Sequence, residues 1–247
     1  MQVAIITGAA RGIGHATARE FLAEGWAVAL LDVLEARIDD PHALALRCDV
    51  SDPAAVAQAV AAVHAHFGRI DALVNNAGIA IFKPLLETTL EDWNAVLAVN
   101  LTGPFLMAQA VAPLMERGGA MVNITSISGF RASTLRVAYG TSKAGLAHLT
   151  KQLAAELAGL GIRVNAVAPG PVDTAMAKAV HTPEIRADYH DAIPLNRYGT
   201  EEELARVIVF LCGEKASYLT GQVIAVDGGF ESTGIGLATL RAARRNR

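Results

Sequence analysis

A glycine-rich stretch near the start of the chain limits the possible folds more than any other feature. The apolar residues 3–6 suit a strand and run directly into Thr7-Gly8-Ala9-Ala10-Arg11-Gly12-Ile13-Gly14, and residues 12–24 suit a helix. Glycine lets the backbone turn sharply and lets a phosphate approach the free N–H groups at the start of a helix. This order of strand, turn and helix favours a βα unit that binds a dinucleotide over an ordinary glycine turn.

Short apolar runs alternate with longer helix-compatible segments along the rest of the chain. Such alternation is typical of βα units around a parallel sheet buried on both faces, where right-handed crossovers place helices on each face. We predict an α/β fold: a single-domain, Rossmann-like, doubly wound parallel sheet of about seven strands with helices on both faces. The predicted strands span residues 3–6, 27–31, 43–48, 72–75, 120–125, 163–168 and 222–226, and the clearest helices span 12–24, 53–67, 90–115, 139–160 and 201–211.

One domain accounts for most of the chain. Its 247 residues are 52% hydrophobic, enough to bury one large core, and no Pro/Ser-rich linker or repeat divides them. We predict a domain over residues 1–230 and an arginine-rich tail over residues 231–247, which is more simply a solvated tail than an arm that reaches a neighbouring subunit. The connection over residues 33–42 is too short for the usual helix between the second and third strands.

Charge, hydropathy and cysteine usage exclude several classes of function. The net charge of −3 provides no basic stripe for nucleic acid, and the apolar runs are shorter than the ~20 residues of a membrane helix. No charged leader precedes the first apolar run, so we expect Met1 to begin the fold. Cys48 and Cys212 have no metal or redox spacing, and His64 and His66 point different ways on a helix. We predict buried free thiols, a reducing cytoplasm and no metal.

The residue that ends the second predicted strand indicates which dinucleotide binds. Asp32 follows Gly14 by eighteen positions, where a carboxylate can accept hydrogen bonds from the adenosine ribose and repel a 2′-phosphate. Val33 and Leu34 offer no compensating cation. We predict NAD(H) rather than NADP(H). The positive charges of Arg11 and Arg37 leave NADP(H) possible. The alternative role for Asp32 is that of a solvated surface carboxylate.

Tyr139 and Lys143, in the stretch Val-Ala-Tyr-Gly-Thr-Ser-Lys-Ala-Gly, lie four residues apart and would share one helix face. A free tyrosine has a pKa near 10, so action near pH 7 to 8 requires lowering it by about two to three units, or about 3–4 kcal/mol. One positive charge ~4 Å away at an effective dielectric of about 20 supplies that much. The pair is a candidate acid/base with its own pKa modifier; a core tyrosine and a solvated lysine are the alternative.

Taken together, several motifs carry a family resemblance. The glycine loop, Asn75-Asn76-Ala77-Gly78, Asn100, Ser126 and the Tyr139/Lys143 pair occur in order, with thirteen residues from Ser126 to Tyr139. With them the chain resembles the classical short-chain dehydrogenase/reductase family over residues 3–229. The resemblance implies a single-domain Rossmann-like enzyme, usually tetrameric, that transfers hydride between nicotinamide and a carbonyl or alcohol carbon.

The same resemblance assigns roles to residues of this chain. It implies that Tyr139 exchanges a proton with the substrate oxygen, Lys143 lowers the phenol pKa and binds the nicotinamide ribose, and Ser126 holds the substrate oxygen. Asn100 would position a water that connects Lys143 to solvent. The implied cofactor contacts, besides Tyr139 and Lys143, are Gly8, Arg11, Gly12, Ile13 and Gly14 at the pyrophosphate, Asp32 at the ribose, Asp49 and Val50 beside adenine, Asn75, Asn76, Ala77 and Gly78 beside the adenosine half, and Pro169, Gly170, Val172 and Thr174 beside nicotinamide.

The expected substrate pocket is mostly apolar, which suits a secondary alcohol or ketone of modest size and leaves sugar alcohols open. Residues 176–195 are polar and hard to assign, as in a lid over substrate or a variable surface loop. For His181 and His190 we favour solvated loop histidines over residues that reach a substrate. The candidate wall residues are Ser128, Phe130, Val137, Val172 and Met176.

We predict an NAD-linked alcohol dehydrogenase or ketone reductase that acts as a homotetramer. The first alternative is a 3-oxoacyl-[acyl-carrier-protein] or 3-oxoacyl-CoA reductase. The resemblance links those enzymes mostly to NADPH and a basic docking surface. Asp32 counts against the first of these requirements, and Arg131 with Arg136 only weakly meets the second. A non-catalytic nucleotide-binding regulator is the other class, and it would be expected to have a broken catalytic set.

Overall fold

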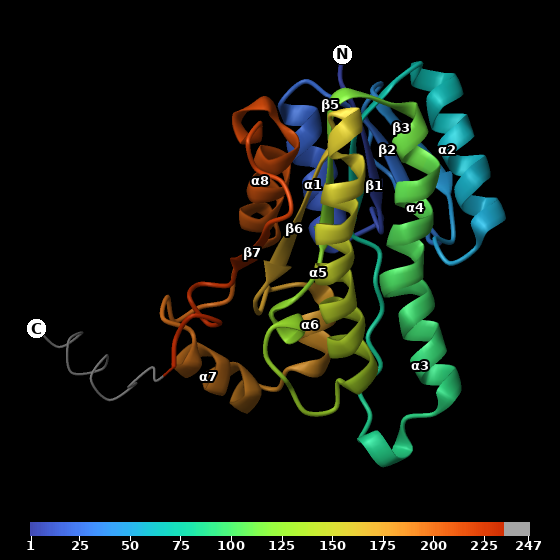
Figure 1. Ribbon diagram of the computed structural model, residues 1–247. Helices are drawn as coiled ribbons and strands as arrows, with labels where there is room; N and C mark the ends of the chain where they lie inside the picture. Colours follow the sequence, from blue (N-terminus) through green and yellow to red (C-terminus); the bar gives the residue numbers. More distant parts are fainter. Residues whose placement is uncertain (235–247) are drawn as a thin grey trace, which may run out of the picture.

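A seven-stranded parallel sheet runs through the centre of the protein, in the strand order β3-β2-β1-β4-β5-β6-β7 (Figure 1). The structure is a computed structural model that describes residues 1–234, apart from the side chains of residues 176 and 179. Most of the predicted tail therefore lies outside the described residues. The strands are β1 (Val3–Thr7), β2 (Ala27–Asp32), β3 (Ala43–Arg47), β4 (Ile70–Asn75), β5 (Met115–Ile124), β6 (Arg163–Pro169) and β7 (Val223–Val226). The predicted sheet is confirmed.

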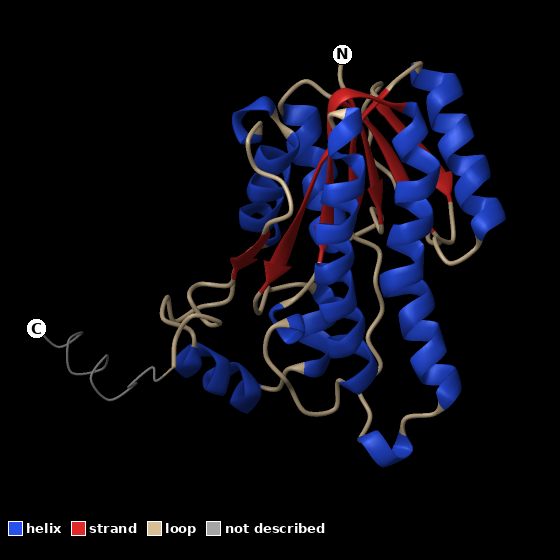
Figure 2. Ribbon diagram, in the orientation of Figure 1, coloured by secondary structure: helices blue, strands red, loops and turns tan. Residues whose placement is uncertain are grey.

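Helices cover both faces of this sheet, as Figure 2 shows. All residues of β1 and β4 are buried, because each strand is apolar on both faces and helices pack on each side. On one face α1 (Gly12–Ala23) and α8 (Glu201–Cys212) close one core cluster, and on the other α2 (Pro53–Phe67), α4 (Gly103–Val111) and α5 (Val137–Leu157) close a second. The predicted helices over residues 12–24, 53–67, 139–160 and 201–211 are thus confirmed.

Local signals explain two details near the adenine side of the sheet. The Asp52 side chain accepts from the Ala54 N–H and Pro53 occupies the first turn of α2, so this helix begins at a capped position. Residues 33–42 carry no helix, as predicted.

Cys48 and Cys212 are free and buried, and burial raises their pKa values to about 11 and about 12.

The predicted single helix over residues 90–115 is interrupted. It consists of α3 (Leu90–Leu97), a π-helical turn (Ala98–Thr102) and α4, and β5 begins at Met115, five residues before the predicted strand at residue 120. Such a wide turn often marks a functional site, and here it contains the buried Asn100. The stretch Leu90–Leu114 is apolar and long enough to cross a membrane by length and composition alone. Here Met107, Ala108 and Val111 bury its inner side against the sheet core.

Residues 176–195 are largely helical, which the sequence did not reveal. Thr174 caps α6 (Ala175–Val180), and Thr182 caps α7 (Pro183–Ala192). Both helices lie beyond the carboxyl ends of the strands (Figure 1). His181 follows α6, hydrogen-bonds the Tyr198 hydroxyl through Nδ1 at 3.0 Å and stacks on Tyr189, so the expectation of a solvated loop histidine is wrong for this residue.

Candidate active site

The glycine loop presents the start of α1 as an anion site. Gly8 and Gly12 have φ values of 65° and 66°, a left-handed conformation that favours glycine. Several helices begin at a side-chain cap: Asp52 caps α2, Thr89 caps α3, Thr174 caps α6, Thr182 caps α7 and Thr200 caps α8. Arg11, at the start of α1, makes no such hydrogen bond. The N–H groups of this first turn can therefore take a pyrophosphate as their cap.

Asn76 and Thr7 hold the loop against the end of β4. The Asn76 Nδ2 donates to the carbonyls of Thr7 and Gly8, both at 3.0 Å, while the Thr7 hydroxyl accepts from the N–H groups of Asn76 and Ala77, also at 3.0 Å each. A Cβ on Gly14 would lie 2.3 Å from the Gly8 carbonyl oxygen. Gly14 thus allows close packing of helix on loop, and this bracing is a role of Asn76 and Thr7 that sequence reasoning missed.

A cleft of about 530 Å³ opens at the carboxyl ends of the strands. It lies where β1 pairs with both β2 and β4, the switch point at which doubly wound sheets bind ligands. The structure brings most of the predicted site residues into its wall: Gly8, Arg11, Gly12, Ile13, Asp32, Asp49, Val50, Asn76, Ala77, Gly78, Ser126, Tyr139, Lys143, Pro169, Gly170, Val172 and Thr174.

Asn75 does not belong to this wall. It is buried, and its Nδ2 donates to Asn123 Oδ1 at 2.9 Å between β4 and β5, so its implied contact with the adenosine half is wrong. The alternation of side chains along a strand explains the difference, because successive residues point to opposite faces.

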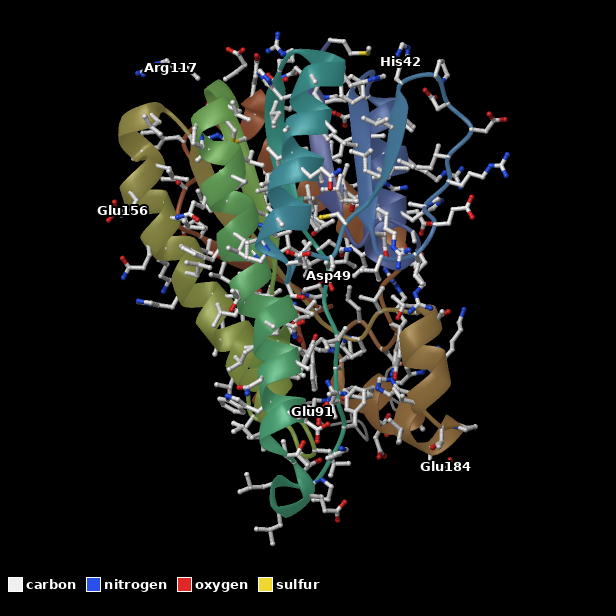
Figure 3. The ribbon with its side chains drawn as sticks, turned by 90° about the vertical axis from the view of Figure 1, so that its right-hand side faces the viewer. His42, Asp49, Glu91, Arg117, Glu156 and Glu184 are labelled. Atoms are coloured by element: carbon white, nitrogen blue, oxygen red, sulfur yellow. The ribbon has the colours of Figure 1, made fainter. Side chains whose placement is uncertain are left out.

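Asp32 is held in a fixed orientation at the end of the cleft beside the glycine loop. Its Oδ2 accepts from the Ala10 N–H at 2.9 Å and its Oδ1 from the Leu34 N–H at 3.0 Å. Both oxygens keep further acceptor capacity for ribose hydroxyls. Arg11 lines the same region, and Asp49, labelled near the middle of the molecule in Figure 3, lines it too.

At the other end, α5 supplies a buried lysine. Lys143 is 4% exposed, and its Nζ donates to the Ile124 carbonyl at the end of β5 at 2.7 Å. Burial penalises the ammonium and lowers the pKa of Lys143 to about 8. The Nζ lies 5.8 Å from the centre of the Tyr139 ring, so the two side chains are neighbours, as their spacing predicts.

The pKa of Tyr139 departs from the expectation. Burial raises it above the ordinary value, while a hydrogen bond with Ser126 and the positive charge of Arg136 act in the opposite direction. In the protein alone, the predicted lowering is therefore wrong in direction. The prediction from the sequence counted one nearby positive charge but not the desolvation of the phenolate, and desolvation has the largest effect on this pKa.

Asn100 lies behind the cleft wall rather than in it. Its Oδ1 accepts from the Ile79 N–H at 2.8 Å, and its Nδ2 donates to the Ile79 carbonyl at 2.9 Å and to the Ser142 hydroxyl at 3.1 Å. A Cβ on Gly78 would lie 3.3 Å from Asn100 Oδ1 and 3.4 Å from Lys143 Nζ, so both groups lie close to Gly78.

The substrate end differs from the predicted apolar wall. Phe130 is 44% exposed and Val137 is also exposed, and neither lines the cleft, because the turn at Ile127–Gly129 carries the chain away from it. Ser128 is buried behind the wall, where its hydroxyl accepts from Arg136 Nη1 at 3.4 Å. Met176 lies in α6, but its side chain is outside the described residues. The cleft wall here also contains Phe82 and Tyr189, which sequence reasoning missed, and Arg136 and His181, which it did not assign to the pocket.

Comparison with known proteins gives a consistent assignment. The chain matches the family described as Enoyl-(Acyl carrier protein) reductase over residues 8–231. It is 43% identical over 244 residues to the 3-oxoacyl-[acyl-carrier-protein] reductase of Thermotoga maritima, a match that covers 92% of this chain and 97% of that one. The chain is a classical short-chain dehydrogenase/reductase.

Other members of the family act on different compounds. This dehydrogenase/reductase is 41% identical over 245 residues to the 2-(R)-hydroxypropyl-CoM dehydrogenase of Xanthobacter autotrophicus, covering 93% of this chain and 98% of that one. The structure of the aldohexose dehydrogenase of Thermoplasma acidophilum matches with a TM-score of 0.89 and 31% identity, covering 94% of this chain and 95% of that one.

The site also fits the nicotinamide cofactor that the family uses. The uncapped α1, the close-packed glycine loop and the continuous cleft from Asp32 to Lys143 provide an anion site, a ribose acceptor and a buried cation in one groove. Among the described residues no group of His, Cys, Asp or Glu is arranged to hold a metal ion. As a member of this family, the protein is an oxidoreductase that acts on CH–OH groups.

Proposed function

We propose that this dehydrogenase/reductase interconverts a secondary alcohol and a ketone with NAD(H), using Tyr139 as the acid/base. The observation that carries the choice of NAD(H) is the carboxylate of Asp32, fixed by two backbone N–H groups in the cleft wall. A 2′-phosphate at this position would meet a negative charge, whereas ribose hydroxyls would meet an acceptor. Val33 and Leu34, which also line the cleft here, bring no positive charge.

The reacting end supports proton exchange at Tyr139. When bound, the cofactor supplies the hydride acceptor or donor. Ser126 and Tyr139 both face the cleft and hydrogen-bond each other, so together they can hold the substrate oxygen. Tyr139 gives its proton to this oxygen during reduction and takes one during oxidation. Lys143 keeps a positive charge beside the phenol below its pKa of about 8, which favours the phenolate.

Asn100 acts as a positioning residue for proton transfer between Lys143 and solvent. Its two hydrogen bonds to the Ile79 backbone and its place behind Gly78 fix an amide next to Lys143. A water held there would connect the ammonium to solvent. Such a path would return the proton after each turnover.

The test is a panel of secondary alcohols, polyols, ketones and 3-oxoacyl thioesters, assayed with NAD(H) and NADP(H) in both directions. The proposal expects the highest kcat/KM for a small alcohol or ketone with NAD(H). Turnover confined to 3-oxoacyl thioesters with NADPH would instead support the second candidate, a 3-oxoacyl-[acyl-carrier-protein] or 3-oxoacyl-CoA reductase. That candidate is favoured by the relative from Thermotoga maritima, which is 43% identical.

We also propose that the enzyme is a homotetramer in the cytoplasm. Within the described residues, β7 forms one edge of the sheet, and the α3–α4 side exposes Leu86, Leu90 and Phe105. An open strand edge and exposed apolar side chains are features that association would cover. Sedimentation at micromolar concentration tests the assembly, and a monomer would contradict it.

A further inference from the structure

Arg136 carries a positive charge to the substrate end of the cleft, three residues before Tyr139. It stands at the start of α5 and is one of the cleft-lining residues. Its guanidinium lies 5.1 Å from the centre of the Phe82 ring and its Nη1 lies 3.4 Å from Ser128 Oγ. The aromatic face and the buried hydroxyl therefore hold the guanidinium against the cleft wall.

The backbone that leads into Arg136 is strained. Leu135 has a φ of 61°, in the left-handed region that a leucine rarely adopts. Its carbonyl accepts from the Lys83 N–H at 3.2 Å, which helps to keep the turn in place. Strain of this kind costs about 1–3 kcal/mol and is concentrated at functional sites. The turn is what directs Arg136 into α5 beside the cleft.

No carboxylate balances this charge. Asp32 and Asp49 are the carboxylates in the cleft wall, and both lie at the adenosine end. Among the described residues Arg136 makes no ion pair, whereas Arg186 and Arg197 nearby are paired with Asp173 and Glu203.

The other polar groups at this end are compatible with an anion. Lys143 is engaged with the Ile124 carbonyl, and His181 lines the cleft with its Nδ1 held by the Tyr198 hydroxyl, which leaves its Nε2 edge for other partners. The positive charge of Arg136 acts to lower the pKa values of both Tyr139 and His181.

We propose that Arg136 is a specificity-determining residue that binds a carboxylate on the substrate, so that this enzyme acts on a hydroxy acid or the corresponding oxo acid. This inference rests on the proposed function and narrows its substrate class. A guanidinium can hold a carboxylate through two parallel N–H···O bonds, and such a contact fixes the orientation of the substrate. The carboxylate takes no part in the chemical step and places the carbinol carbon beside Tyr139 and Ser126.

The experiment compares Arg136→Met with a matched control. Arg131→Met removes the same charge from the same connecting segment, but Arg131 donates to the Phe230 carbonyl and does not line the cleft. Each variant and the wild type are assayed with 2-, 3- and 4-hydroxy acids and with their methyl esters, which keep the alcohol and lose the charge. We expect the wild type to prefer an acid, and Arg136→Met to lose roughly 10- to 100-fold in kcat/KM for that acid. Turnover of the ester should fall only by what loss of the Arg136 charge near Tyr139 costs both substrates, so the readout is the ratio of kcat/KM for the acid to that for the ester. The NAD affinity should stay within about twofold, and Arg131→Met should behave as the wild type.

Binding gives a readout that does not depend on turnover. Calorimetry with short alkyl carboxylates and their amides, in the presence of NAD⁺, should show carboxylate binding that Arg136→Met removes and Arg136→Lys partly restores. Equal turnover of acids and esters, or equal binding of carboxylate and amide, would overturn the inference while leaving the proposed function intact. Absence of turnover with every alcohol would contradict the proposed function, and the calorimetric comparison would still decide the role of Arg136.

Discussion

The buried lysine makes a quantitative prediction about stability and pH. Burial lowers the pKa of Lys143 from 10.5 to about 8 in the folded protein, and its side chain is only 4% exposed. Below pH 8 both states hold the proton. Between pH 8 and 10.5 the unfolded chain binds the proton and the folded protein does not, so stability rises with pH. One pKa unit corresponds to about 1.4 kcal/mol, so Lys143 contributes about 3 kcal/mol of increase across this window.

The assay is denaturant unfolding of the cofactor-free protein between pH 7 and 10.5, for the wild type and Lys143→Met. Other groups titrate in this range, so the quantity of interest is the difference between the two curves. Wild type should gain about 3 kcal/mol relative to Lys143→Met over this interval. Lys151→Met, at an exposed position of the same helix, controls for loss of a lysine charge and should follow the wild type. Parallel curves for the wild type and Lys143→Met would refute the reasoning.

Three further predictions follow from the cleft. Tyr139→Phe should keep NAD binding and lose turnover roughly 100- to 10,000-fold in steady-state assays, since it removes only the proton donor; near wild-type rates would disprove the acid/base role. Asp32→Ala should weaken NAD binding roughly 10- to 100-fold in fluorescence titration and reduce the ratio of NAD affinity to NADP affinity. Unchanged affinity for both cofactors would contradict the role given to Asp32. Gly14→Ala places a Cβ 2.3 Å from the Gly8 carbonyl, so it should cost about 1–3 kcal/mol of stability and weaken NAD binding, whereas Gly159→Ala, which meets nothing within 4 Å, should do neither.

The parts of the fold that the sequence predicts are those in which local pattern and tertiary packing agree. The inner strands β1, β2 and β4 are short runs buried on both faces of the sheet, whereas the edge strands β3 and β7 are only partly buried. The sequence predicts a helical region over residues 90–115 but not its π turn, which contains Asn100 with its hydrogen bonds to Ile79 and Ser142. These partners lie far away in sequence.

The substrate end was predicted least well, also for a physical reason. Its helix α6 has only six residues and α7 is polar, so apolar periodicity is weak in both, and their threonine caps are the clearer signal. Phe130, a candidate wall residue, is exposed after the turn of Ile127–Gly129. The position of Arg136 has a clearer signal in the sequence. It lies three residues before Tyr139 at the start of a helix, and this spacing places the two side chains close together.

The most direct test of the proposed function follows the hydrogen that is transferred. The alcohol that the substrate panel identifies is prepared with deuterium on its carbinol carbon and incubated with NAD⁺ and the enzyme. Mass spectrometry of the reduced cofactor should show one deuterium per NADH formed, and Tyr139→Phe should form almost none. Reduced cofactor without deuterium, or labelled product formed at the wild-type rate by Tyr139→Phe, would contradict direct hydride transfer with Tyr139 as the acid/base.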